Sequence, residues 1–361
     1  MTAGVIAGVV LIALTVVLVV LALLTGTGRY LVRAGWEEGK ILARRRPIVE
    51  VIADPSTSPS DRAALRLVLA ARAFAADSLG LRAKASFTTY TRVSSDTLVL
   101  VLSGAYRDQL RAYTWWFPIV GDVPYKGFFD FPAAVRAAKD LRTEGFDAYV
   151  RPSPAFSTLG FFNDPVLSTS LGSDSNFLAN TVIHELTHNT FYPAGQAVFN
   201  ESFANFVGSR GAAAFFRSRG DSTAAALADA RWADDTVLGG FWASVYGSLD
   251  SAFRAHPGSK AARLAARDTI FAAARARLVN EIGPRIKTFS VEHLALVRLD
   301  NAALLAYRVY YTDLPLFDDV YARCGGDLRR AVQEIILLGR RSPDDPFQGL
   351  RTWRESNGSC G

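Results

Sequence analysis

Two histidines with a glutamate between them could hold a metal ion and use it for hydrolysis. His184, Glu185 and His188 form an H-E-x-x-H pattern. Residues four apart on a helix lie one turn apart on the same face, so both histidines could direct a ring nitrogen at one ion. Glu185 would lie beside the first ligand, where its carboxylate could reach a water on the metal. This combination predicts zinc-dependent hydrolysis with Glu185 as the general base.

Catalytic zinc sites commonly use three protein ligands, and two histidines with one glutamate are such a set. The segment 192–195, Tyr-Pro-Ala-Gly, predicts a turn, and 199–206 carries apolar residues at helical spacing. Two helices joined by that turn could bring Glu201 back to the histidine pair, which makes Glu201 the candidate third ligand. The longer H-E-x-x-H-x-x-G-x-x-H pattern is excluded, because Ala194 stands where its third histidine would be.

The same pattern can also occur on an amphipathic helix that binds no metal. Val182, Ile183 and Leu186 predict that this helix is buried. Two histidines and a glutamate on a buried helix are costly without a partner, so a metal site is favoured over a purely structural helix. Asn205 lies one helical turn after Glu201, and its amide oxygen could accept the free ring N–H of a ligand histidine.

Several separate motifs resemble a family of bacterial putative aminopeptidases, zinc metallopeptidases of gluzincin type. These motifs are IHELTH, FNESFANFVGSRGA, AFSTLGFFNDPVLST, FPIVGDVPYKGFF, ARRRPIVEVIADP and YARCGGDL. The resemblance covers most of the chain after about Tyr30. It implies a zincin-like fold, with His184, His188 and Glu201 at the metal positions and Glu185 as the general base. Relatives often carry a lipoprotein-type signal that ends in Cys, and this chain lacks one.

The elements that must position this site predict an α+β fold that is mainly helical and contains a small sheet. Residues 30–80 favour a helical hairpin, and 86–165 contain the strands. Residues 175–361 hold the metal site and the C-terminal helices. Within the middle region we expect strands at 97–103, 113–117 and 147–151, a loop at 121–127 and a helix at 132–143. Later helices are expected at 224–246, 260–281 and 290–311.

Gly4 to Leu24 is an apolar run of the length that spans a bilayer as a helix. No basic residue precedes the run, which favours an uncleaved anchor over a signal peptide. We therefore expect a transmembrane anchor at 1–28 and a peptidase domain at 29–361. The arginines after the run favour a cytoplasmic domain, but they also belong to an expected helix. The outer side of the membrane is the preferred location.

Composition excludes some classes of function. The 361 residues carry a net charge of +6, with the basic residues dispersed along the chain and no nucleic-acid-binding motif. The two cysteines, Cys324 and Cys360, could form one disulfide or remain free thiols, and no C-x-x-C motif indicates a redox or metal role. The expected partners are therefore a peptide substrate and the membrane, without nucleic acid.

Further residues could contact a peptide. Phe156 to Phe162 could form an exposed strand that pairs with the substrate backbone, with Gly160 permitting close approach. Asp164 could hold a free α-amine or simply form a turn. A tyrosine at 310 or 311 could stabilise the negative charge on the carbonyl oxygen, although core packing is an alternative for each. Trp115, Trp116 and Tyr125 could line a cleft or belong to the core.

These observations predict a membrane-anchored zinc peptidase, and the resemblance adds aminopeptidase action. Two alternatives remain open. One is an endopeptidase or processing protease with the same chemistry, which would also cut peptides with a blocked N-terminus. The other is a metal-containing interaction protein without turnover, against which the presence of Glu185 argues because a structural zinc needs no base.

Overall fold

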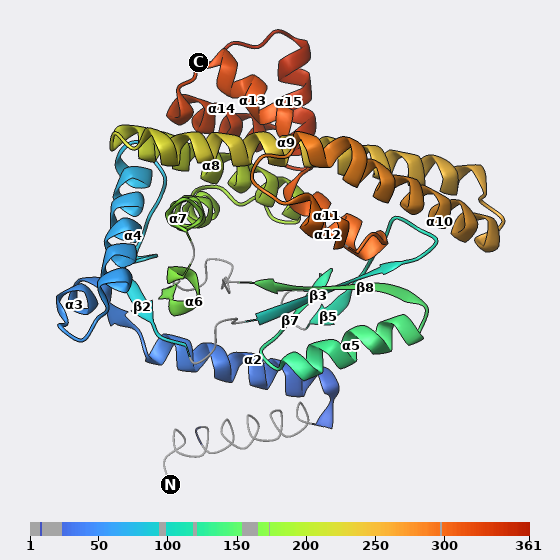
Figure 1. Cartoon of the computed structure of the whole chain (residues 1–361), viewed down its shortest axis with the longest axis horizontal. Helices are drawn as coiled ribbons and strands as arrows, with labels where there is room; N and C mark the ends of the chain where they lie inside the picture. The colour runs from blue at the N-terminus through green and yellow to red at the C-terminus, as the bar shows by residue number, and fades with distance from the viewer. Residues whose placement is uncertain are drawn as a thin grey trace.

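The computed structural model describes residues 8, 24–93, 99–117, 121–153, 165–172, 174–296 and 298–361. It is a mainly helical α+β structure with three small sheets (Figure 1). The helices are α2 (Gly26–Ala43), α3 (Ile48–Ala53), α4 (Pro59–Asp77), α5 (Phe131–Thr143), α6 (Ser168–Leu171), α7 (Ser175–Thr190), α8 (Ala197–Ser218), α9 (Ser222–Ala255), α10 (Lys260–Arg277), α11 (Val291–Leu296), α12 (Asn301–Tyr310), α13 (Leu314–Arg323), α14 (Leu328–Arg341) and α15 (Pro346–Glu355). A π-helical turn, Leu278–Ile282, and a 3₁₀ turn, Gly283–Arg285, follow α10.

The largest sheet centres on β3 (Val99–Tyr106). It pairs antiparallel with β8 (Phe146–Ser153) on one side, and with β4 (Ala112–Tyr113) and β7 (Tyr125–Phe128) on the other. Successive side chains of a strand point to opposite faces, so Ala148 packs with Leu141 of α5 while Tyr149 meets Tyr307 of α12. The sheet is therefore covered by α5 on one face and α12 on the other (Figure 1).

Two minor sheets complete the β structure. β1 (Arg46–Pro47) pairs antiparallel with β2 (Thr89–Thr91), which runs parallel to β9 (Val166–Leu167). β5 (Trp115–Phe117) and β6 (Gly121–Val123) form an antiparallel pair. Because α6 follows β9 directly and α7 comes soon after, the first of these sheets leads the chain into the metal-site helices.

The main core surrounds α7 and α8 and receives α4 and the C-terminal helices α13, α14 and α15. Aromatic rings dominate its centre. Phe199, Phe203 and Phe206 of α8 follow helical spacing, and each ring lies 5.5–5.9 Å from the ring of Phe317 in α13. These aromatic side chains are fully buried, and truncating one to alanine would lower the free energy of unfolding by about 3–5 kcal/mol. They therefore hold α8 firmly in place. The face of α8 opposite this aromatic row is left for the site.

The structure corrects several expected elements. Residues 30–80 do not form a hairpin: β1 and α3 separate α2 from α4, and α4 stands beside α7 while α2 lies below the large sheet (Figure 1). The expected loop at 121–127 contains β6 and most of β7. The expected helix at 290–311 is two helices, because the Asp300 side chain caps α12 by accepting a hydrogen bond from the amide of Ala303.

The expected transmembrane run, Gly4 to Leu24, lies outside the described residues except for Gly8 and Leu24. Within the described ranges, none of the helices combines the length and apolar character needed to cross a bilayer.

The two cysteines, whose pairing the sequence left open, form a disulfide. Cys324 follows α13 directly, and Cys360 is the penultimate residue of the chain. The bond therefore ties the C-terminal tail to the helices that pack on α8, the helix that carries Glu201.

Candidate metal centre

Helix α7 presents both histidines on one face, because its other face packs in the core. Asp174 caps the helix by accepting a hydrogen bond from the amide of Phe177 at 2.9 Å. Its carboxylate also receives two hydrogen bonds from Arg231 of α9, at 2.8 and 2.9 Å, which fixes where the helix begins. Leu186 is fully buried, and the half-buried His184 and His188 lie on the opposite side of the helix.

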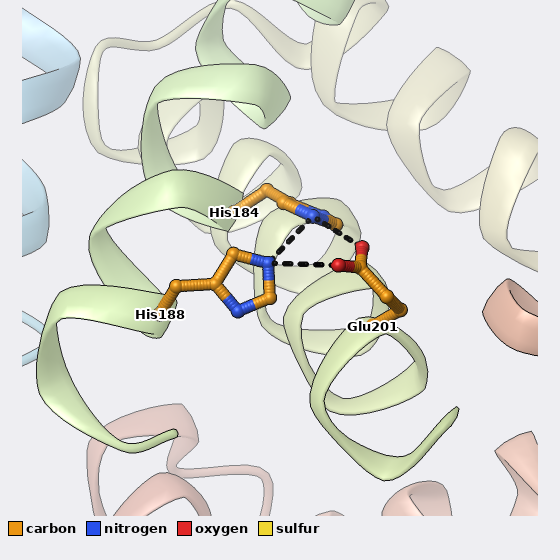
Figure 2. Close-up of side chains that lie close together, drawn as sticks. All are labelled: His184, His188 and Glu201. Atoms are coloured by element: carbon orange, nitrogen blue, oxygen red, sulfur yellow. Dashed lines mark hydrogen bonds and ion pairs between the residues drawn. The ribbon is translucent and has the colours of Figure 1, made fainter. Parts of the chain in front are cut away.

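Helix α8 returns Glu201 to the histidines, as the turn between the two helices predicted. Gly195 has a φ of +77°, a conformation that glycine adopts without strain, and it redirects the chain after α7. The Asn200 side chain then donates a hydrogen bond to the carbonyl of Pro193 at 2.9 Å and fixes the turn against α8. Since Phe199 and Phe203 anchor the core face of α8, the neighbouring Glu201 points to α7 (Figure 2).

The three side chains converge on one point (Figure 2). The Nε2 atoms of His184 and His188 lie 3.2 Å apart. Glu201 places Oε2 at 3.3 Å from Nε2 of His184 and Oε1 at 3.6 Å from Nε2 of His188. Two nitrogens bound to one tetrahedral zinc at about 2.05 Å would be about 3.3 Å apart. The donor set, two imidazoles and one carboxylate, and its spacing therefore fit a zinc ion.

The two histidines keep the Glu201 side chain in its charged form. Burial alone would raise the pKa of the Glu201 carboxyl, but hydrogen bonds to His184 and His188 outweigh it and hold that pKa well below its usual range. Burial likewise opposes the charged form of His184, and its hydrogen bond to Glu201 raises its pKa overall. Glu201 is therefore an ionised carboxylate, the form that ligates a metal.

Glu185 lies beside the three converging side chains without belonging to them. Within the part of the chain that the structure describes, the group of possible ligand atoms comes from His184, His188 and Glu201. Glu185 is half-buried and follows His184 directly in α7, and its charge contributes to raising the pKa of both His184 and Tyr310.

Of the two candidates Tyr310 and Tyr311, the structure brings Tyr310 to this site. Burial first, and then the charge of Glu201, raises the pKa of its hydroxyl. The serine next to Glu201, Ser202, is buried; its hydroxyl donates to the carbonyl of Val309 and accepts from the amide of Thr312, both at 3.2 Å. These bonds hold the end of α12 against α8 and so fix where Tyr310 lies.

Tyr311 and Asn205 point elsewhere. The negative charge of Asp235 first, and then burial, raises the pKa of Tyr311, whose hydroxyl interacts with that carboxyl group. Burial raises the pKa of Asp235 to about 7. The Asn205 amide donates to Asp235 at 3.3 Å and to the carbonyl of Tyr310 at 3.4 Å. Nδ1 of His188 is buried and has no hydrogen-bond partner within the described ranges, so Asn205 does not hold that ring as expected.

Two more tyrosines and an arginine surround the site. Tyr125 of β7 and Tyr192 of the turn are partly exposed, and the charge of Glu201 raises the pKa of each, after the larger effect of burial. Tyr125 was one of three aromatic residues proposed for a cleft; Trp115 packs on Tyr113 instead, with ring centroids 5.0 Å apart. Tyr192 and Arg151 were not singled out from the sequence, although a tyrosine in the turn between two metal helices was a usable signal.

The remaining expected contacts with a peptide lie outside the described residues. This applies to the strand Phe156 to Phe162, with its Gly160, and to Asp164. The other two histidines of the chain are exposed: His256 ends α9, and His293 in α11 contacts Ser290.

The close approach of α7 and α8 requires a glycine. A Cβ atom at Gly208 would lie 2.9 Å from Oδ1 and 3.1 Å from the carbonyl oxygen of Asn180, and 3.2 Å from Cβ of His184. We expect Gly208→Ala to push the helices apart, lowering stability by about 1–3 kcal/mol and weakening zinc binding. Melting temperature and zinc affinity would measure both effects.

Gly247 in α9 provides the matched control. It also lies in a helix, but its added Cβ would meet no atom within 4 Å, so Gly247→Ala should melt at or above the parent temperature. A Gly208→Ala protein that matched the parent in both measurements would show that the helices need no glycine contact.

Comparison with known proteins identifies the family. A family model described as "Putative aminopeptidase" matches residues 29–348, a segment that contains both metal-site helices and Tyr310. No curated protein and no solved structure matches the chain. Since the family model spans most of the sequence, the chain belongs to the Putative aminopeptidase family.

Proposed function

We propose that this protein is a zinc-dependent peptidase of gluzincin type that removes residues from the N-terminus of peptides. The observation that carries the proposal is the convergence of His184, His188 and Glu201 at zinc-ligand spacing, with Glu185 next to His184 on α7. Membership of the family supports the peptidase and exopeptidase parts of the proposal.

The chemistry divides among few residues. His184, His188 and Glu201 would hold one zinc ion, which when bound polarises a carbonyl group and makes a water more acidic. The Glu185 carboxylate accepts the proton of the attacking water and returns it to the leaving amine. Tyr310 accepts a hydrogen bond from Arg151, so the hydrogen of its own hydroxyl is available for the oxygen that becomes negative in the transition state.

Membrane attachment and location form a second part of the proposal. The apolar run from Gly4 to Leu24 would anchor the chain, with the peptidase domain on the outer side of the membrane. The disulfide between Cys324 and Cys360 supports that side, because such bonds persist mainly in oxidising compartments.

The full chain in detergent would test the function directly. We expect one zinc per chain by mass spectrometry, cleavage of peptides with a free N-terminus, loss of cleavage on chelation and recovery with zinc. The same peptides with an acetylated N-terminus should remain intact. Cleavage of the acetylated peptides would favour the endopeptidase alternative. A zinc-loaded protein that cleaves neither set would favour the interaction protein.

A further inference from the structure

Arg151 extends from the large sheet to the metal site. Along β8, the alternate residues Asp147, Tyr149 and Arg151 share the face that α12 covers. Asp147 accepts a hydrogen bond from the amide of Asn301 at 3.0 Å, and the hydroxyls of Tyr149 and Tyr307 are 3.1 Å apart. Arg151 continues this row and donates from Nη2 to the hydroxyl of Tyr310 at 3.1 Å. The row of contacts thus ends at Tyr310 of α12, whose hydroxyl has a pKa that is raised by burial and also by the charges of Glu201 and Glu185.

Within the described ranges, Arg151 has no carboxylate close enough for an ion pair. Its neighbour on the same face, Asp147, is by contrast paired with Arg267 at 2.5 Å. A guanidinium carries five N–H donors, and the Tyr310 hydroxyl takes only one hydrogen bond from it. The other donors of this half-buried guanidinium could therefore bind an anion that enters the site.

The charge of Arg151 acts on the tyrosines that surround the metal site. Burial and the charge of Glu201 raise the pKa of Tyr310, and the charge of Arg151 lowers it. The charge of Arg151 also lowers the pKa of Tyr125, which burial and nearby charges raise to about 12. Because Arg151 donates to the Tyr310 hydroxyl at 3.1 Å, a peptide whose carbonyl group reaches the three ligands and Tyr310 would pass within reach of a positive charge that has no carboxylate partner among the described residues.

We propose that Arg151 binds a carboxylate of the peptide substrate. This inference rests on the proposed peptidase function and names its substrate class: short peptides whose C-terminal carboxylate reaches Arg151, or peptides with an acidic side chain near the cleaved bond. The planar fork of a guanidinium matches the two oxygens of a carboxylate, and such charge-assisted pairs are stronger than neutral hydrogen bonds.

The test compares peptides that differ only in one carboxylate, using the zinc-loaded full chain. Comparing Ala-Ala-Ala with its C-terminal amide tests whether Arg151 binds the C-terminal carboxylate. Comparing Ala-Asp-Ala amide with Ala-Asn-Ala amide tests whether it binds an acidic side chain. We expect kcat/KM to favour one carboxylate over its neutral partner by about 10- to 100-fold. In Arg151→Met this preference should fall to within about 3-fold, whereas Arg136→Met, on the exposed side of α5, should retain it.

Two outcomes would overturn the inference. One is a preference that stays unchanged in Arg151→Met. The other is that Arg151→Met lowers cleavage of the acid and of the amide peptide equally, and that it causes no further loss in a Tyr310→Phe protein. Arg151 would then act only by positioning Tyr310. Calorimetric binding of the same peptides to the parent and to Arg151→Met separates this inference from the proposed function. If no peptide were cleaved, the peptidase proposal would fail. Arg151 would still be supported as a carboxylate-binding residue if the parent bound the carboxylate peptides more tightly than the neutral ones and Arg151→Met did not. Equal affinities would refute it.

Discussion

Replacing Glu185 with Gln is expected to lower kcat for peptide cleavage by about 10²- to 10⁴-fold while one zinc stays bound per chain. The amide keeps the size of the carboxylate but cannot take a proton from water. Because Glu185 does not belong to the converging ligand atoms, its loss removes no metal ligand. Steady-state cleavage of a peptide with a free N-terminus, together with zinc content by mass spectrometry, would measure the two parts separately.

Glu355→Gln is the matched control, since Glu355 is exposed at the end of α15 and its substitution changes the net charge by the same amount as Glu185→Gln. It should cleave at the parent rate. If Glu185→Gln cleaved within a few-fold of the parent, another group would have to accept the proton. If it lost zinc as well as activity, Glu185 would hold the metal or the fold of α7, and its assignment as the base would be wrong.

The arrangement of the candidate ligands could be predicted because it depends on local geometry. His184 and His188 are one helical turn apart, so any regular helix at this position brings them together. Glu201 required one further step, the turn at Tyr192 to Gly195, and the proline and glycine there predicted where α7 ends. The mainly helical α+β class followed from the same spacing patterns. Only the meeting of the three ligand atoms in space depended on the tertiary structure.

The rest of the site depends on contacts between segments that are distant in sequence. Arg151 and Tyr125 reach the site through the register of β8 and β7 on β3, where both Tyr125 and Tyr149 lie opposite Ser103. No spacing rule predicts such pairing, and the glycines and proline around Tyr125 are typical of a loop. Sequence alone also could not choose between Tyr310 and Tyr311, because the choice depends on the buried Asp235 of α9, which interacts with Tyr311.

Replacing His184 with Ala is expected to abolish both zinc binding and cleavage. Changes to residues that only orient a metal ligand already cost about 10- to 100-fold in metal affinity, so removal of a ligand should cost at least that much. Glu201→Ala should do the same, because its carboxylate faces both histidines. Since either change leaves only two ligands, the double variant should be scarcely worse than the single ones. Zinc affinity from competition with a chelator would measure all three proteins.

The fold should survive these substitutions, since neither side chain is part of the aromatic core around Phe317. Circular dichroism of the zinc-free proteins would check this. The control is His293→Ala, which removes an exposed histidine that contacts Ser290 in α11; its zinc affinity should equal that of the parent. A His184→Ala protein that kept one tightly bound zinc would place the metal elsewhere and would also remove the basis for assigning Glu185 as the base. A folded parent that bound no zinc would leave the three converging side chains as a hydrogen-bonded group between α7 and α8.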